Sequence, residues 1–140
     1  MSLPRPEELL PHRDRFLLLD RLLRLDADGA EAIGHFDPED VHGHFPGNPI
    51  VPGVLLLEGL AQTLACLDLL RRGPEAGTPM LVGFDRVRFR APVIPPAQVH
   101  YRVTVKEERF GMLQASGEVR HEERRVCTAL ILGTVAAARP

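Results

Sequence analysis

The chain of 140 residues is poor in the residue types that would mark several classes of protein. It has two cysteines, Cys66 and Cys127, both in apolar stretches, so reduced thiols are expected rather than a disulfide framework. It also lacks a basic excess, because 17 Lys and Arg stand against 19 Asp and Glu and the net charge is −2. Binding of nucleic acid requires positive charge that neutralises phosphates, so no nucleic-acid partner is expected.

Signals for secretion or membrane insertion are also missing. Residues 1–15 carry charges throughout and contain no apolar core of a signal peptide. The most apolar stretch, residues 49–70, is long enough to span a bilayer, but Glu58 and Asp68 interrupt it. A charge at the bilayer centre is costly, so we expect a soluble, cytoplasmic protein without membrane insertion.

The composition is that of a folded globular protein. Hydrophobic residues make up 44% of the chain and charged residues 26%, which argues against disorder. Neither an internal repeat nor a low-complexity linker divides the sequence. The length is sufficient for a real hydrophobic core, and we expect one domain that spans residues 1–140.

The first half of the chain predicts two strands followed by a long loop. Residues 6–10 favour a short helical turn, and residues 16–25 favour a strand. The turn-rich tetrapeptide at 26–29 separates it from a second strand at 30–36, which predicts a hairpin. Residues 37–53 hold four prolines and three glycines, and long loops in compact domains commonly carry function.

One long helix is predicted for residues 54–72. Arg71 and Arg72 suit the negative end of a helix dipole, and Gly73 is a typical stop signal. The segment is apolar nearly all round, so the helix should be buried on most of its faces.

Four strands should follow this helix. They are expected at residues 81–90, 99–106, 112–120 and 125–135. In the first of them, Val87 and Phe89 point to one face, and Arg86, Arg88 and Arg90 point to the other. Tight turns near residues 110–111 and 121–123 predict an antiparallel sheet, which should wrap the single apolar helix.

A carboxylate inside the apolar helix is the feature that points to chemistry. Glu58 shares a helix face with Gln62, and His44 lies 14 residues before Glu58 in the Pro- and Gly-rich loop. The pair offers a base and an acid, and Gly53 at the helix start offers unpaired N–H groups to a developing oxyanion. The alternative is that Glu58 is partly exposed, or is satisfied by a buried partner in the core.

The segment HGHFPGNPIVPGVLLLEGLAQ, residues 42–62, resembles the active-site signature of the β-hydroxyacyl-acyl carrier protein dehydratases of type II fatty acid synthesis. Three other stretches resemble further blocks of this family, so the similarity covers nearly the whole chain. They are LPHRDRFLLLDRLL (10–23), VGFDRVRFRAPVIPP (82–96) and VCTALIL (126–132). The chain departs from the family where a Gly–Asp pair is usual, because it has Pro96 and Ala97 there.

The resemblance implies a hotdog fold of class α+β, in which a curled antiparallel sheet wraps one central helix. It implies a homodimer, which in the family often assembles further into a hexamer. His44 of one protomer would face Glu58 of the other across a substrate tunnel. The implied reaction converts a (3R)-hydroxyacyl group on acyl carrier protein into the trans-2-enoyl group and water. A glutamate at position 58 implies dehydration without isomerisation of the double bond.

The resemblance also implies roles for particular residues. Neutral His44 would take the C2 proton, the Gly53 N–H would polarise the thioester carbonyl, and Glu58 would protonate or position the departing hydroxyl. Phe45, Leu57 and Gln62 are candidates for contact with substrate, with plain core packing as the alternative for the two apolar ones. The implied chemistry needs no metal or organic cofactor.

Several readings stay open from the sequence. Arg86, Arg88 and Arg90 form a candidate docking stripe for acyl carrier protein, or an ordinary solvated face. A hotdog thioesterase and a non-catalytic acyl-thioester-binding module are the alternative functions. His42 and His44 could ligate a metal, but no clear third ligand accompanies them. His12 is expected to be structural.

Overall fold

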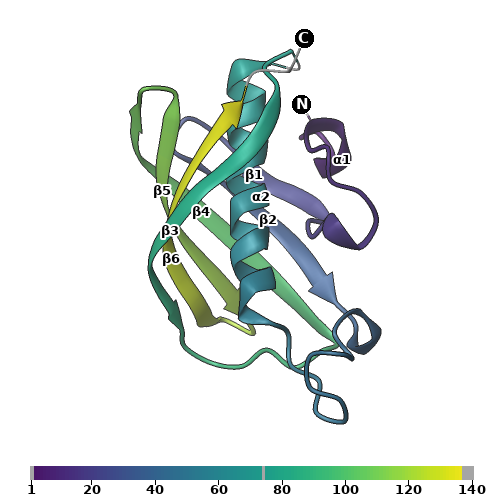
Figure 1. Ribbon diagram of the computed structural model, residues 1–140. Helices are drawn as coiled ribbons and strands as arrows, with labels where there is room; N and C mark the ends of the chain where they lie inside the picture. Colours follow the sequence, from purple (N-terminus) through teal and green to yellow (C-terminus); the bar gives the residue numbers. More distant parts are fainter. Residues whose placement is uncertain (1, 74, 137–140) are drawn as a thin grey trace.

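A curled, six-stranded antiparallel sheet wraps around one long helix in this computed structural model, which describes residues 2–73 and 75–136 (Figure 1). The strands are β1 (Arg21–Leu25), β2 (Gly29–Phe36), β3 (Thr78–Phe89), β4 (Ala97–Arg109), β5 (Met112–His121) and β6 (Arg124–Ala136). They are hydrogen-bonded in the order β1-β2-β4-β5-β6-β3. The helices are α1 (Pro6–Leu9) and α2 (Gly53–Arg72), with 3-10 turns at Asp14–Phe16 and Pro38–Asp40. The predicted hotdog fold is confirmed.

Two tight hairpin turns set the register of the last three strands. The β4–β5 turn places Phe110 and Gly111 at φ values of 53° and 76°, and the β5–β6 turn places Glu122 and Glu123 at 51° and 64°. Two successive residues with positive φ form the turn whose twist matches that of paired strands. The turns lie where the sequence predicts them.

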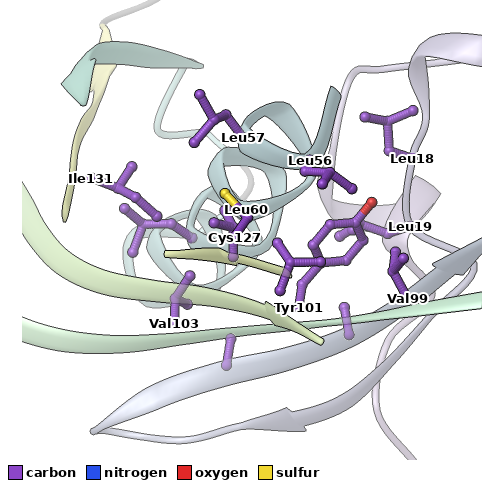
Figure 2. Packing of buried hydrophobic residues seen from close by; sticks show 14 of the residues in the cluster. Leu18, Leu19, Leu56, Leu57, Leu60, Val99, Tyr101, Val103, Cys127 and Ile131 are labelled. Carbon is purple, nitrogen blue, oxygen red and sulfur yellow. The ribbon is translucent and has the colours of Figure 1, made fainter. Parts of the chain in front are cut away.

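The concave face of the sheet is apolar and packs on α2. Alternate residues of β4 point inward, and Val99, Tyr101 and Val103 are at most 1% exposed. They meet Leu60 and other helix residues in one continuous core (Figure 2). By length and composition α2 could cross a membrane, but 61% of its most apolar window is buried inside the fold. The prediction of a helix buried on most faces is confirmed.

The predicted strand at 16–25 is wrong in its first half, because β1 begins at Arg21. Gln62 of α2 accounts for the difference. Its side-chain oxygen accepts a hydrogen bond from the Leu18 N–H at 3.0 Å, and its amide nitrogen donates to the Phe16 carbonyl at 2.6 Å. The backbone of residues 16–18 is therefore held by a helix side chain and not by a neighbouring strand.

Strand β3 lies at an edge of the sheet and begins earlier than predicted, at Thr78. A bulge between Asp85 and Arg88 sets two residues of β3 opposite Ala129 of β6, and Arg86 takes the φ value of 51° that this requires. Val87 packs against the core, and Arg88 pairs with Thr128. The predicted alternation is thus interrupted at the bulge, and Phe89 is 55% exposed.

Candidate active site

His44 lies in the loop before α2 with its ring held in a defined orientation. Its Nδ1 lies 3.0 Å from the Ile50 carbonyl, and its ring packs on Phe45 with the centroids 4.1 Å apart. A carbonyl can only accept a hydrogen bond, so Nδ1 must carry the proton in this contact. The neutral ring then presents Nε2 as an acceptor, which is the atom that a general base uses.

Gly53 begins α2 and lines the same surface pocket as His44. The first N–H groups of a helix have no partner inside the helix, and they lie at its positive end. The position also has a steric reason for glycine, because a Cβ there would lie 2.5 Å from the Phe89 ring. The first turn of α2 therefore combines free donors with close packing beside His44.

Glu58 lies in the second turn of α2, in a different pocket. Its Oε1 accepts a hydrogen bond from Gln62 Nε2 at 3.1 Å and lies 3.5 Å from His12 Nε2. Its side chain is 29% exposed, so it is neither a core carboxylate nor a fully solvated one. Gln62 is itself fixed by its two backbone contacts, and it holds the Glu58 carboxyl group at the pocket wall.

Within one chain the structure does not bring His44 and Glu58 together. The His44 pocket is formed by the loop before α2, the start of α2 and residues 89–93. The Glu58 pocket is formed by His12, one face of α2 and residues of β3 and β6. The two pockets share no residue. The two members of the predicted acid–base pair thus line separate pockets of the chain.

Comparison with known families settles the relationship of this chain. The model of the FabA-like domain matches residues 10–130. The chain belongs to the FabA-like family. It is 40% identical over 134 residues to the 3-hydroxyacyl-[acyl-carrier-protein] dehydratase FabZ of Pseudothermotoga lettingae, covering 94% of each chain. It is 38% identical to the FabZ of Syntrophobacter fumaroxidans, covering 93% of this chain and 90% of the relative.

Solved structures share the fold of this FabA-like domain at low sequence identity. The dehydratase heterocomplex ApeI:P from Xenorhabdus doucetiae superposes with a TM-score of 0.84 at 13% identity, over 96% of this chain and 93% of that one. A hypothetical thioesterase from Streptococcus pneumoniae, solved with coenzyme A, gives 0.67 at 8% identity, over 86% and 88%. Dehydratases and thioesterases share this architecture, so the fold alone does not select between them.

Two predicted substrate-contacting residues of the FabA-like domain occupy different environments. Phe45 is 50% exposed and stacks on His44. Leu57 is 9% exposed, belongs to the hydrophobic core and lines neither the His44 pocket nor the Glu58 pocket. Phe45 is therefore accessible at the surface, whereas Leu57 packs in the core.

The predicted arginine stripe lies on exposed positions of β3 and just beyond it. Arg90 lines the His44 pocket and donates to Thr128 Oγ1 at 3.1 Å. Arg86 lines a shallow hollow on the outer sheet face together with Arg102 and Arg125. Positive charge thus extends from the outer sheet face to the edge of the His44 pocket.

His12 is the functional candidate that the sequence reasoning missed. It lies 3.5 Å from the Glu58 carboxylate, and its Nδ1 is buried without a hydrogen-bond partner among the described residues. In the sequence, His12 lies in the stretch 10–23 that resembles the N-terminal block of the dehydratase family, and a structural role was expected there. Its approach to Glu58 depends on how the N-terminal segment packs on α2.

Metal ligands are not clustered in the part of the chain that the structure describes. Across residues 2–73 and 75–136, no three His, Cys, Asp or Glu side chains are placed to hold one ion. The two thiols are buried, and burial raises the pKa of Cys66 to about 12 and that of Cys127 to about 11. Both cysteines are therefore protonated core residues at neutral pH.

Proposed function

We propose that this chain, as a single hotdog domain, is a cytoplasmic 3-hydroxyacyl-[acyl-carrier-protein] dehydratase of fatty acid biosynthesis. It converts a (3R)-hydroxyacyl thioester into the trans-2-enoyl thioester and water. The observation that carries this proposal is the oriented His44 ring beside the free N–H groups of the α2 start. The similarity to FabZ dehydratases over 94% of the chain supports the same assignment.

His44 acts as the base in this proposal. With Nδ1 donating to the Ile50 carbonyl, Nε2 is free to take the proton from C2 of the substrate. Loss of this proton pushes negative charge onto the thioester oxygen. The Gly53 N–H at the positive end of α2 donates a hydrogen bond to that oxygen and stabilises the charge.

Glu58 acts on the leaving group. Protonated Glu58 gives its proton to the C3 hydroxyl, which leaves as water while the C2–C3 double bond forms. The electron pair of the C2–H bond becomes the new π bond, and the C3–O pair leaves with the oxygen. The hydrogen bond from Gln62 Nε2 keeps the carboxyl group in position.

The two halves meet in a homodimer, which is part of the proposal. Exposed apolar side chains lie along edge strand β3 and around the His44 pocket, which a second copy would cover. They include Met80, Leu81, Val82, Phe89, Phe45 and Val54, which are 47–68% exposed. Residues of β3 line both pockets, so pairing of two β3 edges is the contact that we propose brings His44 of one protomer to Glu58 of its partner. A trimer of such dimers is the larger assembly that we propose.

A direct assay tests the reaction and separates it from the alternatives. The purified protein is given a 3-hydroxyacyl thioester, and the absorbance of the conjugated enoyl thioester is followed together with release of free thiol. Enoyl product without thiol is expected. Thiol without enoyl product would indicate a thioesterase, and neither product would indicate a binding module.

Replacement of Glu58 tests the acid. Glu58→Gln keeps the shape of the side chain but removes the proton, so turnover should fall by roughly 10²–10⁴-fold. The thermal unfolding midpoint should stay near that of the wild type, since Glu58 is partly exposed and Gln retains its hydrogen-bonding capacity. Full activity of Glu58→Gln would contradict the acid role.

Acyl carrier protein is the partner that we propose for the arginines of β3. Arg90 lies at the His44 pocket, so an acidic carrier bound there could deliver its thioester to His44. Charge reversal of Arg86 and Arg88 should raise the KM for carrier-bound substrate and spare a small thioester analogue. Equal effects on both substrates would contradict docking at this surface.

A further inference from the structure

We propose that Asp68, through its ion pair with Arg72, closes the far end of the Glu58 pocket and limits the length of the acyl chain. This inference rests on the proposed function, because it takes the pocket to hold the acyl chain of the substrate. Asp68 is the buried carboxylate that the proposed reaction does not use, and it lines the same pocket as Glu58.

The pocket extends along one face of α2. Glu58, Ala61, Ala65 and Asp68 all line it, and their spacings of three, four and three residues place them in one row on the helix. Ten residues of helix rise about 15 Å, which separates the two carboxylates along the helix axis. The pocket therefore runs parallel to α2, with Glu58 at one end and Asp68 at the other.

Between these two ends the lining is apolar. Ala61 and Ala65 are the small residues of the helix row, and Met80 and Leu81 of β3 and Ile131 of β6 line the same pocket. Small side chains on the helix leave room along its surface, and the apolar walls suit an alkyl chain. A hydroxyacyl group whose C3 oxygen meets Glu58 would extend its tail along this row.

The far end is polar and is tied to the sheet. Asp68 Oδ1 accepts a hydrogen bond from Arg72 Nε at 2.7 Å, and the Asp68 side chain is 5% exposed. Arg72 Nη2 donates to the Gly111 carbonyl at 2.6 Å, and Thr134 Oγ1 donates to the same carbonyl at 2.8 Å. The group that ends the pocket is thus linked to both α2 and the β4–β5 turn.

An alkyl tail that reached Asp68 would contact a charged carboxylate, and an alkyl chain has no donor that could hydrogen-bond to it. Separating a buried charge from its partner is costly, so displacement of the Asp68–Arg72 pair is unfavourable. An extended chain advances about 1.2 Å per bond, so the roughly 15 Å between the two carboxylates holds about 12 bonds before the tail meets the polar end. Short and medium acyl chains should fit, and the longest ones should not.

A chain-length series on the wild-type protein is the first test. Saturated acyl thioesters from butyryl to stearoyl compete with turnover of a 3-hydroxybutyryl thioester. Each methylene that enters the apolar row should lower the inhibition constant by about fourfold. The fall should stop before stearoyl, and a fall that continues through stearoyl would overturn the proposal. This measurement needs no variant to fold.

The second test exchanges the end group. In Asp68→Leu, kcat/KM for 3-hydroxystearoyl thioester should rise at least tenfold relative to that for 3-hydroxybutyryl thioester, since two or more methylenes gain apolar contact. Asp68→Asn keeps a polar end and should leave the ratio nearly unchanged. Glu108→Gln, which removes the exposed Arg71–Glu108 pair at the same end of α2, is the matched control.

The outcomes distinguish this inference from the proposed function. Failure to dehydrate even the 3-hydroxybutyryl thioester would refute the proposed function itself. Normal turnover of that substrate, with the same chain-length profile in the wild type and Asp68→Leu, would refute only the role of Asp68.

Discussion

The carboxyl group of Glu58 is positioned by two neighbours of different kinds. Gln62 donates to it from one turn further along α2, and Gln62 is in turn fixed by the backbone of residues 16–18. His12 approaches the same oxygen from the N-terminal segment. Because two contacts already fix the orientation of the Glu58 side chain, little orientational entropy is lost when substrate binds. This favours proton transfer in a defined direction.

His12 should therefore act as a positioning residue for Glu58. In His12→Leu the carboxyl group loses one contact, and kcat should fall by up to about 10²-fold, while KM for a small thioester changes much less. His12→Gln places an amide donor near the position of Nε2 and should recover most of the activity. Steady-state kinetics give kcat and KM for both variants. An equal loss of kcat in His12→Leu and His12→Gln would contradict the positioning role.

At the scale of elements, α2 touches the sheet closely through a glycine. The ideal position of a Cβ at Gly59 lies 2.2 Å from the ring of Tyr101, which is completely buried in β4. Burial, together with the charges of Asp20 and Glu58, raises the pKa of Tyr101, so this side chain stays a neutral phenol. The contact lets the helix approach β4 while Glu58 faces its pocket.

Gly59→Ala should destabilise the protein by about 1–3 kcal/mol through overpacking against a ring that cannot move away. The steric cost should exceed the gain of about 1 kcal/mol that alanine brings to a helix interior. Urea unfolding measures the difference. Gly43→Ala is the control, because a Cβ there would meet no atom within 4 Å, and its stability should change by less than about 0.5 kcal/mol.

At the scale of the whole molecule, the separation of the two pockets makes a second copy necessary for the proposed reaction. His44 and Glu58 line different pockets of one chain, and exposed apolar side chains line both pockets. A monomer would leave the base without its acid. Dehydratase activity should therefore increase and decrease with the fraction of the protein that is dimeric.

Mixed dimers test this dependence. A dimer of one His44→Ala chain and one Glu58→Gln chain should regain roughly one working site, because the intact His44 and the intact Glu58 then meet across the interface. Each variant alone should be nearly inactive. Activity is measured after the two variants are unfolded and refolded together, with a separately refolded mixture as the control. No recovery in verified mixed dimers would contradict a site that is shared between protomers.

The sequence by itself determined the outline of the fold, because that outline depends on local patterns. The apolar run that ends at Arg71–Arg72 and Gly73 predicted α2, and the alternation in β4 and the turn residues predicted the antiparallel sheet. Glu58 also stood out, because a carboxylate is unusual in an apolar helix, and the resemblance of residues 42–62 to the dehydratase signature implied the roles of His44 and Gly53.

Only the tertiary structure decided which side chains meet. Residues 16–20 have the composition of a strand, but Gln62, 44 residues after Leu18, takes the backbone groups that a strand partner would need. His12 reaches Glu58 and Asp68 ends the same pocket only because the N-terminal segment and the sheet close around α2. Contacts between distant residues depend on packing in three dimensions, which neither periodicity nor spacing along the chain encodes.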